Sequence, residues 1–290
     1  DNPQWHGKAP KPELVPIIEQ ELDSQFMIAP SIIAGDISNL EKEIKRCEDG
    51  RADYIHLDVM DGQFVPNTTF DHEKIKELRP LTIIPFDTHL MINDPVKHVD
   101  DYIDAGSDII SVHAEVCDES SFGEICDKLE SNQVGIGLAI NPDTELPDWT
   151  YKFIPSLDQI IIMSVVPGKS GQKYILSTHE KTQRIVKQLD ENGFQGYIEA
   201  DGGVNLDNIG ACFEDGARVF VGGSAIIGQT DVRVIIKEFR NQVLRSRRQL
   251  LIKKAHELGG NQLVNQWIDL HVVGKKKDSL MQIAKELGFQ

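Results

Sequence analysis

Eight short apolar segments, rich in β-branched residues, recur at nearly even intervals along the 290-residue chain. Segments with the period of an α-helix lie between most of them. Most of the eight are apolar at both alternating sets of positions, as in parallel strands that are covered on both faces. The predicted strands are residues 26–33, 54–60, 83–90, 109–113, 134–140, 159–165, 196–201 and 219–223.

This alternation predicts an α/β fold, a single (β/α)8 TIM barrel. The predicted helices are residues 40–47, 72–78, 96–105, 122–129, 178–189 and 206–215. The link 141–157 is less clearly helical. A doubly wound open sheet is the structural alternative. The sequence favours the barrel, because no G-x-G-x-x-G motif follows the first strand and eight regular repeats suit a closed sheet.

Two segments lie outside the predicted barrel, which spans residues 26–243. Residues 1–25 form a polar N-terminal extension with four prolines. Residues 244–290 form a predicted helical tail with nine Lys/Arg and four Asp/Glu, hence a net charge of +5 in a chain whose total is -16. Helical periodicity is clearest at 250–258 and 280–287. The tail is either a docking element for a neighbouring acidic subunit or another partner, or a solvated extension packed on its own barrel.

The charge and composition argue against some classes of partner. A net charge of -16 disfavours nucleic acid as a partner. The sequence has no apolar run of about 18 residues, which argues against a membrane span. Its four cysteines form no C-x-x-C pair, a pattern typical of reduced thiols. We therefore expect a cytoplasmic protein that binds neither nucleic acid nor membrane.

Titratable residues gather where three predicted strands end. His56 and Asp58 close the second strand, His89 the third and Asp201 the seventh. Residues two apart face the same side of a strand, and barrel strands end at one mouth, so these side chains should converge. A single inward histidine could be an ordinary core residue, but burying all four groups without a ligand is costly. Two imidazoles and two carboxylates suit Zn, Fe(II), Mn or Co, and they predict metal-assisted proton transfer at carbon.

Glycine-rich loops follow the sixth and eighth predicted strands. Glycine lets backbone N–H groups approach an anion, and barrels often bind phosphate with the loops of their last strands and a short helix start. The sequence thus predicts a phosphate site. The candidate residues are Gly168, Lys169, Ser170, Gly171, Gly223 and Ser224.

Several stretches resemble the ribulose-phosphate 3-epimerase family, in the family's order between about residues 27 and 228. They include Ile55-His56-Leu57-Asp58-Val59-Met60-Asp61-Gly62, Asp87-Thr88-His89-Leu90-Met91 and Asp201-Gly202-Gly203. Further matches are residues 29–33, 64–67, 163–165, 167–168, 171–172 and 223–226. Together these motifs are highly specific to the family.

The resemblance implies a metal-dependent enzyme of the pentose phosphate pathway that interconverts D-ribulose 5-phosphate and D-xylulose 5-phosphate at C3. His56, Asp58, His89 and Asp201 match the ligands of one divalent metal ion. Asp58 and Asp201 also match the two acid/base residues, on opposite faces of the substrate. Further residues match substrate contacts: Ser31, Met60, Met91, Met163, Gly202 and Gly203. We expect a homo-oligomer that binds a small-molecule ketose phosphate as its substrate.

The sequence departs from the family pattern in two places. Val166, Lys169 and Ser170 replace the asparagine, the phenylalanine and the glycine after the phenylalanine in the loop after the sixth strand. After the first-strand motif the family usually has serine-alanine-aspartate, where this chain has Ala34-Gly35-Asp36. These changes motivate an alternative substrate, a ketohexose 6-phosphate such as allulose 6-phosphate. A non-catalytic barrel scaffold is a second alternative, which the retention of all four metal positions disfavours.

Overall fold

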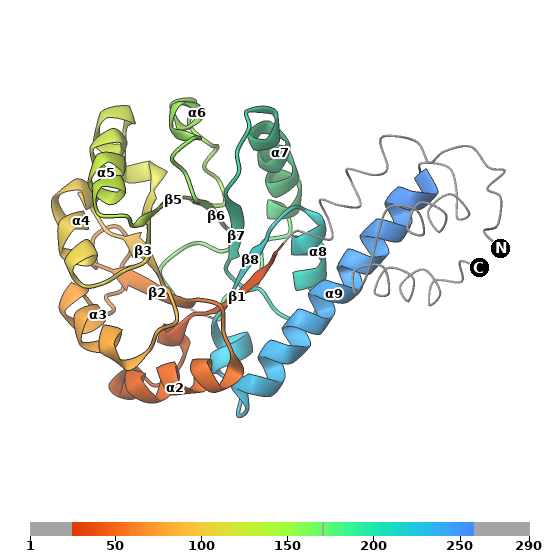
Figure 1. Ribbon diagram of the computed structural model, residues 1–290, viewed down its shortest axis with the longest axis horizontal. Coiled ribbons are helices and arrows are strands. Elements are labelled where there is room, and N and C mark those ends of the chain that lie inside the picture. Colours follow the sequence, from red (N-terminus) through yellow and green to blue (C-terminus); the bar gives the residue numbers. More distant parts are fainter. Residues whose placement is uncertain (1–24, 170, 258–290) are drawn as a thin grey trace, which may run out of the picture. The chain divides into compact units, whose positions relative to one another are not determined.

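The fold is an eight-stranded parallel barrel, seen in a computed structural model that describes residues 25–169 and 171–257. Its strands belong to a compact unit, Phe26–Val243 (Figure 1). Around the sheet their order is β1-β8-β7-β6-β5-β4-β3-β2. The strands are β1 Met27–Pro30, β2 Ile55–Met60, β3 Phe86–Met91, β4 Ile109–His113, β5 Gly135–Ile140, β6 Gln159–Met163, β7 Tyr197–Asp201 and β8 Val219–Gly222.

The sheet closes between its first and second strands. A parallel bridge joins Ser31, just after β1, to His56 in β2. The barrel is therefore nearly closed, as the regular repeats predict, and the open-sheet alternative is wrong. Strands β2 and β3 pair in a register that sets Asp58 opposite His89. Farther around the barrel, the β6–β7 pair sets Met163 opposite Asp201, so the predicted site residues come to one end of the barrel.

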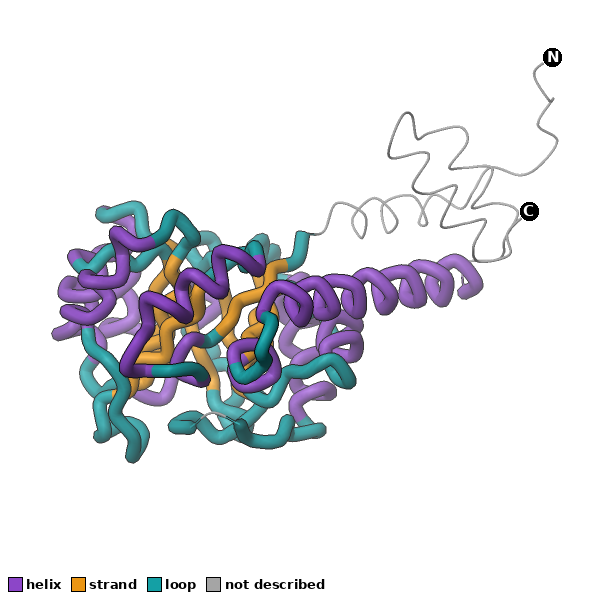
Figure 2. Tube along the Cα trace, turned by 90° about the horizontal axis from the view of Figure 1, so that it is seen from below, coloured by secondary structure: helices purple, strands orange, loops and turns teal. Residues whose placement is uncertain are grey.

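Helices surround the strands of the barrel (Figure 2). They are α2 Leu40–Gly50, α3 His72–Leu78, α4 Pro95–Asp104, α5 Glu119–Ser131, α6 Thr150–Phe153, α7 Thr178–Glu191, α8 Ile209–Glu214 and α9 Val232–Glu257. Short 3₁₀ turns are η1 Ile32–Ala34, η2 Ile37–Asn39, η3 Arg79–Leu81 and η4 Ala114–Val116, and η5 Gly223–Ile227 is one π-helical turn.

Local sequence explains where several helices begin and what they bury. The side chain of Asp71 accepts a hydrogen bond from Lys74 N–H at the start of α3. Asp118 accepts one from Ser121 N–H and begins α5 with a reciprocal capping box. On α5, Phe122 and Leu129 are buried at helical spacing, so this face anchors the helix to the barrel.

Two predicted strands have an end that is wrong by three residues, and most of the others differ from the observed strands by one or two. The third begins at Phe86 rather than residue 83, and Ile83 is 96% exposed. The Arg79 guanidinium donates hydrogen bonds to the carbonyls of Thr82 and Ile84, which holds this apolar stretch as a loop. The first strand ends at Pro30, because the chain then turns into η1. Apolar composition alone does not distinguish such loops from strands.

The last described helix was only partly predicted. Helix α9 begins at Val232, upstream of the predicted helix at 250–258, and it buries Ile236, Phe239 and Val243. It continues through residue 243, where the sequence places the end of the barrel. The predicted extension before Gln25 and the predicted helix at 280–287 lie outside the described residues, so the proposed domain division stays a prediction. Within the described ranges, no helix has the length and apolarity needed to cross a membrane.

Candidate metal centre and active site

A cavity lies at the carboxyl ends of the barrel strands and holds about 570 Å³ of space, including its open mouth. Most of the predicted substrate and catalytic residues line it. They are Ser31, Asp58, Met60, Met91, Met163, Gly168, Lys169, Gly171, Asp201, Gly202, Gly203, Gly223 and Ser224. The remaining one, Ser170, lies outside the described residues.

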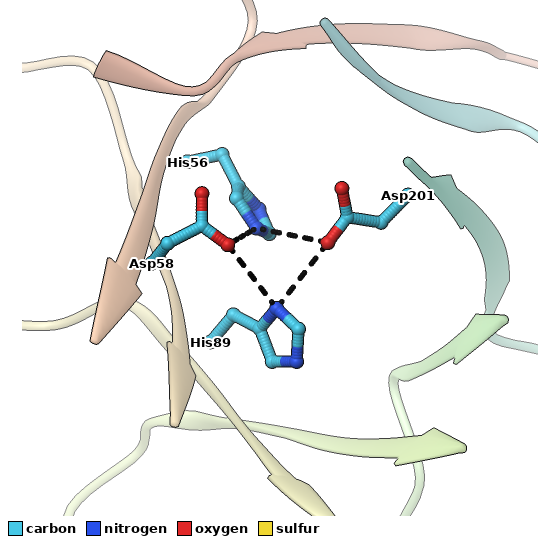
Figure 3. A group of neighbouring side chains, drawn as sticks. All are labelled: His56, Asp58, His89 and Asp201. Carbon is cyan, nitrogen blue, oxygen red and sulfur yellow. Dashed lines mark ion pairs between the residues drawn. The ribbon is translucent and has the colours of Figure 1, made fainter. Parts of the chain in front are cut away.

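Four buried side chains converge beside this cavity (Figure 3). Strand β2 supplies His56 and Asp58, β3 supplies His89 and β7 supplies Asp201. His56 Nε2 lies 3.4 Å from Asp58 Oδ1 and 3.6 Å from Asp201 Oδ2. His89 Nδ1 lies 3.5 Å and 3.3 Å from the same two oxygen atoms. The four predicted metal ligands therefore point at one another.

The unpaired atoms of this cluster fit a divalent cation. His56 Nε2, His89 Nδ1 and Asp201 Oδ2 are buried and have no hydrogen-bond partner among the residues that the structure describes. Leaving three such atoms unpaired costs free energy unless a ligand satisfies them. Ligand atoms about 2.1 Å from a tetrahedral ion stand about 3.4 Å apart, which matches the separations found here. The two imidazoles and two carboxylates accordingly form a candidate metal centre.

The electrostatics of the cluster favour positive charge between the carboxylates. Burial opposes ionisation of Asp58, but its contacts with His56 and His89 outweigh burial and lower its pKa. The same two histidines lower the pKa of Asp201 despite burial. Burial disfavours protonation of His56, yet Asp58, Asp87 and Glu199 raise its pKa well above the ordinary value. The two carboxylates thus place negative charge around one point, which attracts either protons on the imidazoles or a metal ion.

A layer of polar residues beneath the cluster orients His56. Asp87 Oδ2 lies 2.7 Å from His56 Nδ1, and Gln159 Nε2 donates to Asp87 Oδ1 at 3.0 Å. This contact places the proton of His56 on Nδ1 and leaves Nε2 free to face the cluster. Glu199 is fully buried beside it, and burial together with Asp87 raises its pKa well above the ordinary value.

Sequence reasoning assigned no role to Gln159 and Glu199, nor to a second pair, His113 and Glu115. A signal was available for two of these four. Glu199 stands two residues before Asp201, and His113 is the last residue of its strand. Both positions face the inside of the barrel or its mouth.

Apolar side chains and one hydroxyl complete the inner wall. Ser31 Oγ donates to Asp58 Oδ2 at 2.5 Å, so one oxygen of this carboxylate is held while Oδ1 faces the cluster. Met60 and Met91 pack against Val65, and Met163 packs in a separate buried cluster with Ala139. These contacts place three thioethers around the carboxylates and limit the access of water.

The loop after β6 is fixed by two amide side chains. Asn67 Nδ2 donates to the carbonyl of Gly168 at 2.6 Å, and Gln172 Nε2 donates to the carbonyl of Lys169 at 3.0 Å. Gly168 has φ 122°, a conformation that a side chain would strain. Lys169 is exposed and borders the cavity. The helix start expected after the eighth strand is the single π-helical turn η5.

Solved structures share this fold at low sequence identity. KGPDC from Streptococcus mutans matches with a TM-score of 0.56 and 17% identity, over 76% of this chain and 98% of that chain. A 3-hexulose-6-phosphate synthase matches with a TM-score of 0.55 and 15% identity, over 74% of this chain and 99% of that chain. At these identities the matches support the barrel fold alone.

Sequence comparisons are more specific. The ribulose-phosphate 3 epimerase family matches residues 27–227. The ribulose-phosphate 3-epimerase of Bacillus subtilis is 40% identical over 214 residues, which are 73% of this chain and 97% of that protein. The enzyme of the same name from Escherichia coli K12 is 37% identical over 220 residues, 76% of this chain and 96% of that protein. The chain therefore belongs to the ribulose-phosphate 3-epimerase family and is an enzyme of that family.

Proposed function

We propose that the protein is a metal-dependent epimerase that interconverts D-ribulose 5-phosphate and D-xylulose 5-phosphate by two-base proton transfer at C3. The observation that carries this proposal is the convergence of Asp58 and Asp201 on one cavity from strands β2 and β7. Family membership supports it, because the relatives at 37% to 40% identity are named ribulose-phosphate 3-epimerases.

The chemistry needs two groups that exchange protons with the same carbon atom. One of Asp58 and Asp201 removes the proton from C3, and the electron pair moves into an enediolate. The other, which enters the reaction in its protonated form, then delivers its proton to the opposite face of C3, so one proton leaves, one arrives and the configuration inverts. His56, Asp58, His89 and Asp201 would hold one divalent ion, Zn, Fe(II), Mn or Co. Such an ion supplies positive charge that stabilises the negative charge developing on the substrate oxygens.

Other cavity residues bind and orient the sugar phosphate in this proposal. Ser31 positions Asp58, while Met60, Met91 and Met163 enclose the reacting carbon and exclude water. Backbone N–H groups of two glycine-rich loops and the Lys169 ammonium meet the phosphate. The loop residues assigned to binding of the whole substrate are Gly168, Lys169, Ser170, Gly171, Gly202, Gly203, Gly223 and Ser224.

The cellular setting belongs to the same proposal. We place the enzyme in the cytoplasm, as a homo-oligomer of carbohydrate metabolism in the pentose phosphate pathway. All four cysteines are free thiols, which suits a reducing compartment. Burial raises the pKa of Cys47 and Cys212 to about 12, so these two thiols are poor nucleophiles.

A ketohexose 6-phosphate is the second candidate substrate. Its support is the loop after β6, where Lys169 borders the cavity in place of phenylalanine and an exposed Val166 replaces asparagine. The kcat/KM values for D-ribulose 5-phosphate and D-allulose 6-phosphate decide between them. The proposal predicts at least about tenfold preference for the pentose phosphate, within the range that one added carbon allows. Preference for the hexose phosphate contradicts it, and absence of turnover on both sugars favours the scaffold.

A further inference from the structure

His89 has a second polar partner outside the metal-ligand cluster. Its Nε2 lies 2.8 Å from Nε2 of His113, the fully buried last residue of β4. In Figure 3 this nitrogen of His89 points away from the two carboxylates, on the side of the ring opposite the cluster. The other ring nitrogen of His113, Nδ1, lies 3.0 Å from Oε2 of Glu115. A chain of three side chains thus runs outward from one metal ligand, buried at His89 and His113 and partly exposed at Glu115.

Hydrogen-bond counting sets the position of each proton along this chain. The ionised carboxylate of Glu115 accepts hydrogen bonds only, so Nδ1 of His113 carries a proton. Nε2 of a neutral His113 then has a free lone pair, and the 2.8 Å contact requires Nε2 of His89 to donate. In the neutral ring that a metal ligand requires, Nδ1 of His89 is left with its lone pair, directed between Asp58 and Asp201.

We propose that His113 and Glu115 are positioning residues, which fix His89 in the Nε2–H tautomer and so present Nδ1 to the metal ion. This inference rests on the metal site of the proposed function. In this arrangement the Glu115 carboxylate orients His89 indirectly, through the imidazole of His113. His56 differs, because Asp87 contacts its ring directly at 2.7 Å.

The surroundings keep this chain of residues in place. Glu115 Oε1 accepts a hydrogen bond from the backbone N–H of Asn141 at 2.7 Å, so the carboxylate is anchored on the side away from His113. The His89 and His113 rings lie nearly parallel with centroids 4.9 Å apart. The Phe64 ring covers His113 at a centroid distance of 4.6 Å. These contacts restrict rotation of His113, so its Nε2 stays directed at His89.

The test uses two variants of the full chain, Glu115→Gln and His113→Phe, with Glu119→Gln as the matched control. Glu115 is only partly buried, so Glu115→Gln keeps the inference testable if His113→Phe fails to fold. Glu119 pairs with Lys152 on the surface and lies away from the site. Two quantities are measured in each protein: the Zn²⁺ affinity by competition with a chelator, and the histidine tautomers by ¹⁵N NMR of the zinc-loaded protein.

We expect Glu115→Gln to weaken Zn²⁺ binding about tenfold and His113→Phe by more, within the range seen when the partner of a ligand histidine is removed. The wild-type spectrum should show a protonated Nε2 on His89, and Glu115→Gln should shift the His89 and His113 signals. Glu119→Gln should change neither quantity. Unchanged affinity and tautomers in Glu115→Gln would overturn this inference alone. Failure of the wild-type protein to bind Zn²⁺ and Co²⁺ would overturn the proposed metal site as well.

Discussion

Asp58 and Asp201 approach the same ring nitrogen of His89 from different strands, with oxygen atoms 3.5 Å and 3.3 Å from Nδ1. Their other shared neighbour is His56 Nε2, at 3.4 Å and 3.6 Å. The two carboxylates and the two imidazoles alternate around one point. This arrangement links the barrel topology to the chemistry, because only closure of the sheet brings β2 and β7 to a common mouth.

Removal of either carboxylate should abolish most of the activity. We expect Asp58→Asn or Asp201→Asn to lower kcat at least about a hundredfold, because each substitution removes a proton carrier and a charged metal ligand. Steady-state epimerisation of D-ribulose 5-phosphate measures the effect. Asp101→Asn, at an exposed position of α4, is the control and should leave kcat unchanged. Near-normal turnover in either site variant would contradict the two-base assignment.

Lys169 provides a test of phosphate binding. Lys169→Ala should raise KM about tenfold and leave kcat nearly unchanged, because a charge-assisted hydrogen bond to phosphate is worth roughly 1.5–3 kcal/mol. Lys173→Ala is the control, since Lys173 is exposed in the same loop but does not line the cavity. Equal KM values for the two variants and the wild type would make Lys169 an ordinary solvated side chain.

Metal affinity should depend on pH with a definite sign. Burial by itself would lower the pKa of His89, but the contacts with Asp201 and Asp58 outweigh burial, so this pKa is raised. The pKa of His56 is likewise raised by neighbouring carboxylates despite burial. The metal-free protein therefore holds protons that a metal ion must displace, and affinity should fall as the pH falls. Chelator competition at about pH 6.5 and about pH 8 should give at least about tenfold weaker binding at the lower pH. Equal affinities would show that neither imidazole is a ligand.

Gly203 allows a test of how closely the loops around the cavity are packed. It has φ +66°, and a Cβ atom there would lie 2.5 Å from the backbone nitrogen of Tyr174. Gly193 has φ +78° but nothing within 4 Å of such a Cβ. Gly193→Ala should cost about 1 kcal/mol of unfolding free energy from backbone strain alone, and Gly203→Ala about 1–3 kcal/mol more from overpacking. Urea denaturation measures both values, and equal costs would mean that the Tyr174 loop simply moves aside.

Much of the fold could be predicted from the sequence, because strands covered on both faces are continuous apolar runs. Strand β4 and helix α3 have the predicted bounds. The errors come from tertiary contacts that periodicity does not report. Residues 83–84 are as apolar as a strand, yet the carbonyls around them bind the Arg79 side chain instead of a neighbouring strand. Apolar and polar residues are mixed along helix α9, and the sequence pattern does not predict the part of it before residue 250.

The site was partly predictable for a related reason. The alternation of a strand places His56, Asp58 and Asp201 inside the barrel, and parallel topology brings the strand ends together. Neither rule says which inward side chains touch below the mouth. Glu199 gains its significance from its approach to Asp87 across the barrel, and His113 from its contact with His89 on the neighbouring strand. Both depend on the register and tilt of the sheet.

The most direct test of the proposed function follows the C3 proton of D-ribulose 5-phosphate in deuterated water by NMR, with and without a chelator. We predict deuterium at C3 together with formation of D-xylulose 5-phosphate, and suppression of both by the chelator. Absence of exchange in protein that has been loaded with metal would contradict this account of the site.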